Sequence, residues 1–278
     1  MSRAAAPEFT KRRIRNLTIT LASTVLLLTV FYSQNQSLGH ASFTSGYLLY
    51  GTLLFLTLLN LRKRLSFLPA IGSAKFWMQV HIYVGLATFA IFASHVGWRI
   101  PNGKLEVFLA ALYLIVAFSG VYGLYATRVY PKRLTRIGTE VIFERIPQLR
   151  NQLALHARQL VIETCESSDV LAKFYTSRLC YFFEQQPALA YLVHPSSRTR
   201  KKLIHEMEDL DRYLGTDQRQ VREKLTQMVH QKDDLDYHQA LQGRLKIWLF
   251  VHIGLTYSLL LVGLLHGILA HAFSGGPS

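Results

Sequence analysis

The chain has 278 residues, of which 50% are hydrophobic and 17% are charged, and its formal net charge is +14. This composition is too apolar and too sparsely charged for an average soluble protein. The positive charge does not indicate nucleic-acid binding, because many of the basic residues flank long apolar runs, where the positive-inside rule places them. The composition therefore predicts an all-α, polytopic membrane protein.

Five apolar runs are long enough to be transmembrane helices. The first follows a basic N-terminal tail, which predicts a cytoplasmic N-terminus, and no small-residue cleavage site follows it, so we expect a retained signal anchor. Later basic clusters repeat the cytoplasmic signature and predict a multi-pass protein, of the bacterial inner-membrane type. The five runs are 17–33, 44–61, 76–98, 105–127 and 247–273.

The segment between the fourth and fifth runs is expected to be a helical cytoplasmic insert, because it holds nearly all of the Asp and Glu and no run that could span a bilayer. Pro187 is a predicted breaker, and Pro195 to Ser197 form a predicted turn. The last helix, from Gln218, meets only Gly243 before the fifth run, so it is a candidate to continue from water into the bilayer. The expected domains are a tail at 1–16, transmembrane helices at 17–128, the insert at 129–244, a fifth transmembrane helix at 245–273 and an exterior tail at 274–278.

Four histidines form two equally spaced pairs within the apolar runs. His81 and His95 are fourteen residues apart in the third run, and His252 and His266 are fourteen apart in the fifth. Fourteen residues advance a helix by about 21 Å and end roughly 40° short of four full turns, so each pair faces one way near opposite membrane surfaces. Both helices start on the cytoplasmic side, which pairs His81 with His252 and His95 with His266 by depth.

This arrangement predicts metal ligation by two axial imidazoles at each depth. A single intramembrane histidine often only bonds a neighbouring helix, but ionisable residues inside the bilayer are rare and usually functional. Zinc or copper would gather three or four ligands at one depth. Two ligands per site require a macrocycle, so we expect two b-type haems with closed bis-histidine coordination, suited to electron transfer.

Other residues near these pairs leave alternatives open. Arg99 lies four residues after His95 and is expected on the same helix face, either beside haem propionates or as a simple interfacial charge. Lys75, Arg244 and Lys246 are weaker candidates of the same kind on the inner side. The ligand helices also carry glycines that suit either close approach of a porphyrin or close helix packing. These glycines are Gly85, Gly254, Gly263 and Gly267.

The remaining histidines and both cysteines are expected to have ordinary roles. His271 lies about 140° round the helix from His266, so like His40 it suggests either a partner or proton site or a plain interfacial role. Cys165 and Cys180 form no CxxC motif and are expected to stay reduced and to pack between helices. The histidines of the insert lack metal-ligand spacing and are expected at the surface: His156, His194, His205, His230 and His238.

The paired histidines resemble the core of the di-haem b-type cytochrome superfamily, which includes the respiratory cytochrome b and the membrane domains of ferric reductases and NADPH oxidases. The resemblance covers residues 44–127 and 245–272 and rests on His81, His95, His252 and His266. It implies a four-helix haem-binding core. The chain has no Pro-Glu-Trp-Tyr quinol-site motif, no GxGxxG and no flavin or nicotinamide domain, so the resemblance implies a conduit that depends on separate redox partners.

The sequence thus predicts an electron-transfer subunit of an oxidoreductase complex. It would carry electrons between a quinone pool or cytoplasmic reductant and an exterior redox protein such as a cytochrome c. A membrane anchor or redox sensor, whose insert at 129–244 docks a signalling or assembly partner, remains an alternative. So does a quinol-dependent enzyme with a quinone pocket near one haem.

Overall fold

The described part of this computed structural model is helical and contains no strand. The structure describes residues 41–64, 73–138, 141–164 and 169–274, together with the single positions 14, 18, 20 and 22. The predicted first transmembrane run, 17–33, and His40 therefore lie outside the described residues, apart from three scattered positions. The chain divides into two compact units, one formed by the residues before Tyr125 and from Phe250 onward, the other by Tyr125–Leu249.

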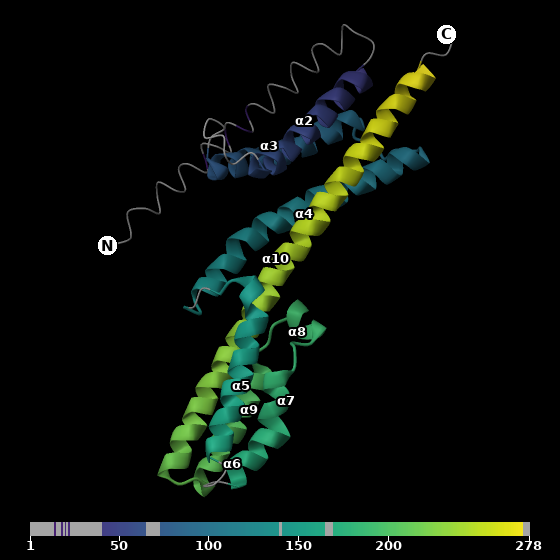
Figure 1. Ribbon diagram of the computed structural model, residues 1–278. Helices are drawn as coiled ribbons and strands as arrows, with labels where there is room; N and C mark the ends of the chain where they lie inside the picture. The colour runs from purple at the N-terminus through teal and green to yellow at the C-terminus, as the bar shows by residue number, and fades with distance from the viewer. Residues whose placement is uncertain are drawn as a thin grey trace. The chain divides into compact units, whose positions relative to one another are not determined.

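From residue 41 onward, the described residues of the first unit form four helices (Figure 1). Its elements are α2 (Ala41–Arg64), α3 (Ala74–His95), the larger part of α4 (Lys104–Thr135) and the last part of α10 (Thr216–Ser274). Ser73 caps α3, because its side-chain oxygen accepts a hydrogen bond from the backbone N–H of Phe76. α2 and α3 are antiparallel, since Ser45 contacts His95 whereas Leu56 contacts His81.

All four helices contribute to the hydrophobic core of the first unit. The buried members are Leu49 and Leu53 from α2, Ile91 from α3, Leu112, Tyr113 and Val116 from α4, and Leu259 and Leu260 from α10. The buried Thr88 hydroxyl and the Tyr113 hydroxyl lie 3.0 Å apart, and the Tyr113 ring stacks on Phe92 with ring centroids 4.1 Å apart. This core fixes the four helices against one another and thereby positions the histidines that α3 and α10 carry.

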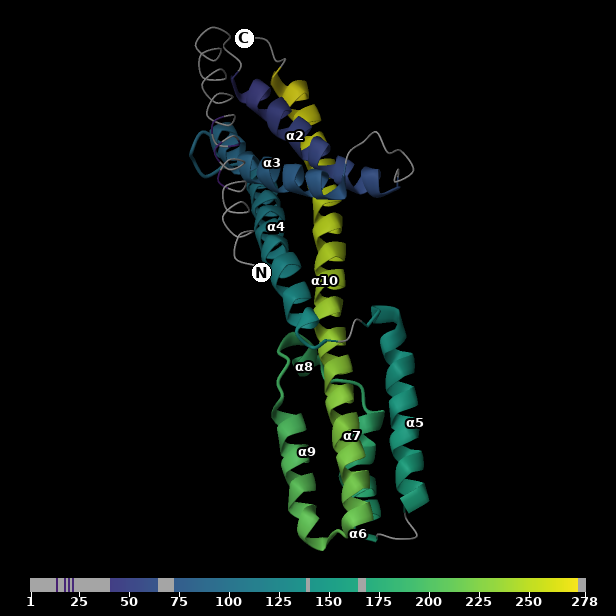
Figure 2. The same ribbon diagram turned by 90° about the vertical axis from the view of Figure 1, so that its left-hand side faces the viewer.

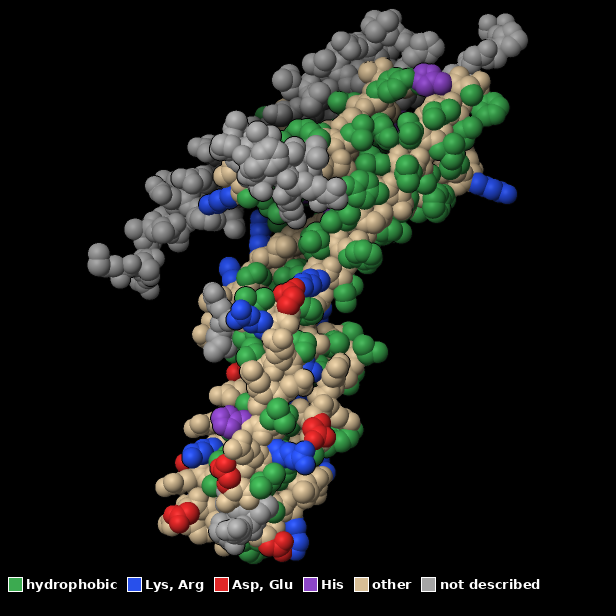
Figure 3. Space-filling view, viewed as in Figure 1, with side chains coloured by type: hydrophobic (Ala, Val, Ile, Leu, Met, Phe, Trp, Pro, Cys, Tyr) green, Lys and Arg blue, Asp and Glu red, His purple; other side chains and the backbone are tan. Residues whose placement is uncertain are grey.

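Three of the described helices are long and apolar enough to cross a membrane: Ala74–His95, Lys104–Thr135 and the apolar part of Thr216–Phe273. Only 11%, 22% and 11% of the residues in their most apolar stretches are buried inside the protein, and Figure 3 shows hydrophobic side chains covering the apolar part of α10. Large exposed apolar surfaces of this kind are unusual for a soluble protein and indicate a membrane protein. The apolar part of α2, Phe43–Leu59, is shorter.

The second unit contains the whole of the predicted insert. It consists of α5 (Ile146–Thr164), α6 (Asp169–Phe174), α7 (Cys180–Glu184), α8 (Leu189–Val193), α9 (Arg198–Asp209) and the first part of α10. A π-helical turn, Tyr175–Leu179, joins α6 to α7, and 3₁₀ turns lie at Phe143–Arg145 and Leu210–Tyr213. α5, α7 and α9 lie beside α10 in both ribbon views (Figures 1 and 2), around a core that includes Phe183, Met207 and Leu225.

Helix breaks in the second unit agree with the sequence predictions. Pro187 lies between α7 and α8, and the turn from Pro195 to Ser197 separates α8 from α9. α10 is a single helix of 59 residues, about 88 Å long, which Gly243 does not interrupt. The last helix therefore continues into the fifth apolar run, as expected. α4 also runs further than the fourth apolar run, through Pro131 to Thr135.

Candidate functional site

The structure brings His95 on α3 and His266 on α10 close together. Their ring centroids are 6.5 Å apart, and the two rings are nearly perpendicular, at 83°. An imidazole–metal bond is about 2 Å long, so two imidazoles that share one metal on opposite sides have ring centres roughly 6 Å apart. The observed separation therefore suits an axial pair on one metal, which we call the outer couple.

Equal spacing pairs His81 on α3 with His252 on α10, and we call these two histidines the inner couple. The Nδ1 atom of His81 lies 3.2 Å from the backbone oxygen of Leu56 on α2. A carbonyl oxygen can only accept a hydrogen bond, so Nδ1 carries the proton and donates it. Nε2, the other ring nitrogen of neutral His81, then carries the lone pair that a metal ligand needs.

Ser119 on α4 fixes the same tautomer of His252. Its hydroxyl donates to the backbone oxygen of Val116 over 2.9 Å, and the same oxygen lies 2.6 Å from Nδ1 of His252. Because the single hydroxyl proton is used on Val116, Nδ1 of His252 must be the donor in the second contact. Hydrogen bonds of this kind commonly orient metal-binding histidines and raise their basicity.

A Ser-Gly dipeptide holds one histidine of each couple, a feature that sequence reasoning missed. On α2, Ser45 Oγ lies 3.0 Å from Nδ1 of His95, and a Cβ on Gly46 would lie 3.1 Å from Cε1 of that ring. On α4, Ser119 contacts His252 as described, and a Cβ on Gly120 would lie 3.6 Å from its Cε1. The repeated dipeptide in two apolar runs was the available signal.

The glycines of α3 and α10 that the sequence singled out differ in their surroundings. A Cβ on Gly263 would lie 3.4 Å from the Tyr50 ring, so this glycine serves close packing between α10 and α2. A Cβ on Gly85, Gly254 or Gly267 would meet no atom within 4 Å. These three positions therefore border open space and do not serve close helix packing.

Arg99 does not lie on the helix face of His95, which corrects the sequence-based placement. α3 ends at His95, and Gly97 and Trp98 both adopt positive φ angles, of 63° and 58°. A left-handed residue just beyond the last turn commonly terminates a helix. Arg99 is exposed beyond this turn, and its contact with a haem propionate stays a prediction that no longer rests on helix periodicity.

Arg244 and Lys246, two of the weaker propionate candidates, make contacts within the second unit. Arg244 donates from Nε to the Leu192 backbone oxygen over 2.8 Å and from Nη2 to that of Val193 over 2.5 Å. Lys246 pairs with Glu144, and its ammonium lies 4.1 Å from the centre of the Phe143 ring. Their contacts hold α8 and the segment before α5 against α10.

His238 is the exception among the histidines of the insert. His156, His194, His205 and His230 are exposed, as predicted, but His238 is only 2% exposed, so its predicted surface position is wrong. It lies on the inner face of α10, where Nδ1 is 3.3 Å from the Gln242 amide. His271 is exposed, and its ring lies against Phe43 and Tyr47 of α2. Cys180 is a free cysteine, and Cys165 lies outside the described residues.

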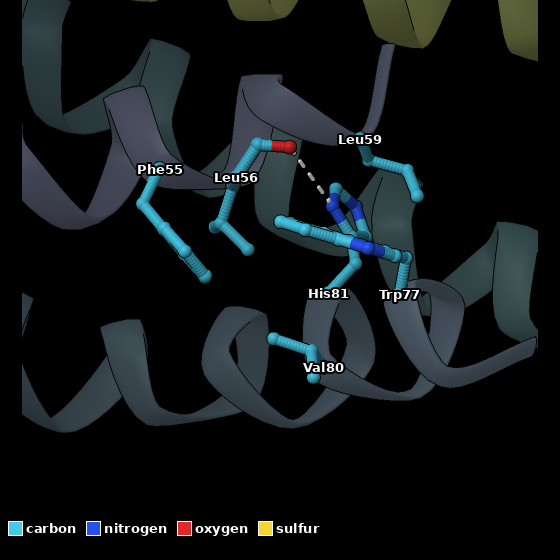
Figure 4. Close-up of a pocket in the computed structure, with 6 residues that line it drawn as sticks. All are labelled: Phe55, Leu56, Leu59, Trp77, Val80 and His81. Atoms are coloured by element: carbon cyan, nitrogen blue, oxygen red, sulfur yellow. Dashed lines mark hydrogen bonds between the residues drawn. The ribbon is translucent and has the colours of Figure 1, made fainter. Parts of the chain in front are cut away.

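A shallow crevice lies beside His81 between α2 and α3 (Figure 4). Apolar and aromatic side chains line it together with the imidazole: Phe55, Leu56, Leu59, Trp77 and Val80. The Phe55 and Trp77 rings pack with centroids 6.1 Å apart. The crevice encloses no space that a water molecule could fill, whereas a ligand pocket usually holds roughly 300 to 1,000 Å³, so it does not by itself favour the quinone site considered above.

The described residues contain no group of three or more His, Cys, Asp or Glu side chains placed to hold a metal ion. A haem differs in this respect, because its macrocycle supplies four ligands and the protein needs to supply only two. Each couple consists of two histidines, as a haem requires of the protein. The tautomers of the inner couple leave Nε2 available to a metal, and the glycines leave open space beside α3 and α10. No protein-family model, curated protein or solved structure matches the chain.

Proposed function

We propose that this protein is a di-haem b-type cytochrome subunit that carries electrons across a membrane. His95 and His266 would hold the outer haem, and His81 and His252 the inner one. The donor or acceptor on one side would be a quinone pool or cytoplasmic reductant, and on the other an exterior redox protein such as a cytochrome c. The proposal makes the protein a component of an oxidoreductase complex rather than a self-sufficient enzyme.

The observation that carries this proposal is the pairing of four histidines by equal spacing on α3 and α10. The 6.5 Å separation of the His95 and His266 rings suits two ligands of one iron. Hydrogen bonds from Nδ1 of His81 and His252 leave Nε2 as the ligand atom of the inner couple. Haem supplies one-electron redox chemistry, while the protein sets its potential through the ligands, burial and hydrogen bonding.

The proposal includes a membrane topology. Five transmembrane helices would cross a bacterial-type inner membrane with the N-terminus in the cytoplasm, and α2, α3, α4 and α10 would form the haem-binding core. The second unit would then lie in the cytoplasm. The support is the alternation of basic flanks with apolar runs along the sequence.

A reduced-minus-oxidised optical spectrum of the purified full-length protein, with haem quantification, tests the assignment. We expect two haems per chain with low-spin b-type spectra. His95→Ala should remove the outer haem and leave the inner one, and His81→Ala should do the reverse. Retention of both haem spectra in either variant, or a wild-type protein purified without haem that binds none on addition, would refute the proposal.

His271→Ala is a matched control on the same helix as His252 and His266. His271 lies five residues beyond His266, is exposed and contacts α2 instead of His95. We expect this variant to keep both haems. Loss of a haem in His271→Ala would show that the spectrum responds to general disturbance of α10 and not to removal of a ligand.

The continuity of α10 favours a second candidate function, a membrane anchor or redox sensor. One helix joins residues of the second unit to those that carry His252 and His266, so a protein docked on the second unit would bind the same helix as the candidate ligands. This candidate predicts a protein that binds haem but exchanges no electrons with quinol or with a co-purifying redox protein. Rapid haem reduction by quinol would exclude it.

A further inference from the structure

The short helix α8 presents apolar side chains outward while its other contacts hold it in place. Leu189 is 81% exposed and Val193 is 75% exposed. The guanidinium of Arg244 on α10 binds the backbone oxygens of Leu192 and Val193, and the Tyr191 hydroxyl donates to Asp233 over 3.2 Å. α8 is thus fixed against α10 on one side, with two branched aliphatic side chains exposed on the other.

The position of Arg244 along α10 places α8 beside the start of an apolar stretch. Arg244 is three residues before Ile247, the first residue of the fifth apolar run, and three residues of helix advance only about 4.5 Å. Ile247 is itself exposed, as is Ile142 in the segment before α5. Figure 3 shows hydrophobic side chains over the α8 region of the second unit. If the fifth run enters a bilayer, α8 lies at the level where it enters.

The second unit that contains α8 also carries exposed basic residues at the end of α4. Arg244, which holds α8, also lies with its guanidinium carbon 5.9 Å from the centre of the Tyr130 ring on α4. The end of α4 and the turn after it present the exposed cations Arg128, Lys132, Arg133 and Arg136. Basic side chains next to a membrane-spanning helix are attracted to anionic lipid headgroups.

We propose that α8 and the basic end of α4 dock on the anionic surface of a phospholipid bilayer, with Leu189 and Val193 inserted at the boundary between headgroups and acyl chains. Apolar side chains that enter this boundary beside basic residues are the usual features of an interfacial anchor. The occupant is lipid and not a protein, because the patch adjoins the point where α10 becomes apolar. This inference rests on the membrane placement in the proposed function, not on the haems.

Site-directed spin labelling of the full-length protein tests the insertion. Nitroxides are placed by Leu189→Cys, Val193→Cys or Leu155→Cys in a Cys165→Ser, Cys180→Ser background, with one chain per nanodisc of mixed phosphatidylcholine and phosphatidylglycerol. Leu155 on α5 is the control, because it is 65% exposed but remote in sequence from the apolar run. The measured quantity is the ratio of the nitroxide's collision rate with oxygen to its collision rate with a water-soluble nickel chelate. We expect this ratio to be several-fold higher at positions 189 and 193 than at position 155. Equal ratios at the three sites would overturn the proposal.

A second comparison tests the role of charge. Lys132→Gln with Arg133→Gln should lower the oxygen-to-nickel ratio at position 189 in nanodiscs that contain phosphatidylglycerol, but not in phosphatidylcholine alone. Lys173→Gln, which removes an exposed cation of α6, should change neither. A ratio unaffected by the paired substitution would refute the requirement for anionic lipid. Haem content measured in the same samples separates the two proposals, since inserted labels in a haem-free protein would refute only the cytochrome assignment.

Discussion

The two units bury polar side chains in opposite ways. In the first unit the buried or half-buried polar groups are neutral and meet in pairs: Ser45 with His95, Ser119 with His252 and Thr88 with Tyr113. In the second unit the buried groups include full charges. Lys232 and Arg150 both pair with Asp236, and Arg200 pairs with Asp233 over 2.8 Å.

This difference shows how each unit manages the cost of removing polar groups from water. A neutral hydrogen-bonded pair costs little when its surroundings are apolar, whereas a charge needs an opposite charge and further hydrogen bonds. Neutral pairing in the first unit also selects a ring tautomer for the inner couple, so it serves the candidate site directly. The charged network of the second unit joins α5 to α10.

Removing one charge from the second unit is expected to have the largest effect. Asp236→Ala leaves buried Lys232 and Arg150 without their carboxylate, and such changes typically cost about 3–5 kcal/mol. Hydrogen exchange of the full-length protein should show a large loss of protection in α5 and the adjoining part of α10. Asp169→Ala breaks an exposed pair with Lys173 and should cost less than about 1 kcal/mol. Equal effects would contradict the distinction between buried and surface charges.

Crowding a neutral pair of the first unit should have the next largest effect. In Gly46→Ala the new Cβ would lie 3.1 Å from Cε1 of His95, and overpacking of this kind costs about 1–3 kcal/mol. Gly51→Ala on the same helix meets no atom within 4 Å and should gain up to about 1 kcal/mol in helix propensity. Thermal unfolding in detergent compares them. If Gly46→Ala unfolds no earlier than Gly51→Ala, the close contact with His95 has no energetic consequence.

Removing a hydrogen bond of the first unit should produce a smaller, electronic effect under the proposed function. Ser119→Ala deletes the acceptor of the His252 Nδ1–H, which lowers the basicity of the imidazole. A bond worth about 1 kcal/mol corresponds to roughly 40 mV, so the midpoint potential of the inner haem should rise by that order. Ser258→Ala, which removes an exposed hydroxyl bonded within α10, should leave both potentials unchanged. A redox titration followed optically distinguishes these outcomes.

The pH dependence of His238 should give the smallest effect. Burial lowers the pKa of His238, and the nearby Asp234 only partly opposes this. As the pH falls below the ordinary value of 6.5, the unfolded chain takes up a proton that the folded unit resists, so stability decreases. Burial also raises the pKa values of Asp233, Asp234 and Asp236, which adds stability as the pH falls.

Comparison of the wild type with His238→Leu isolates the histidine, because the three carboxyls are present in both proteins. Denaturant unfolding monitored by hydrogen exchange in the second unit should show a loss of stability below pH 6.5 in the wild type that the variant lacks. If both proteins respond to pH in the same way, His238 is protonated as readily in the folded unit as in the unfolded chain.

Periodicity and spacing predicted much of the fold and part of the site. Apolar runs predicted the long helices, and the equal spacing of the histidines on the third and fifth runs predicted the close approach of His95 and His266, because a helix converts spacing into depth and direction. The breaks at Pro187 and near Pro195 followed from local chemistry. These features depend on residues close together in the chain or on one regular element.

The features missed by the sequence depend on long-range packing. The contact of Ser45 with His95 depends on the rotation of α2 about its axis, which the weakly amphipathic sequence of this helix does not define. His238 is buried because the opposite charges of Arg150 and Lys232 with Asp236 allow a polar helix face to turn inward. The sequence misplaced Arg99 because α3 ends at His95. Three residues later, Trp98 adopts a left-handed conformation that is unusual for a bulky residue.

The hydrogen bond from His81 to the Leu56 backbone oxygen has a consequence for proton transfer. A peptide carbonyl accepts a hydrogen bond but is far too weak a base to take the proton, so the Nδ1 proton stays on the imidazole. Any group bound at Nε2 can therefore change its charge without an accompanying proton leaving through this contact. At His81 electron transfer would be uncoupled from proton transfer along this route.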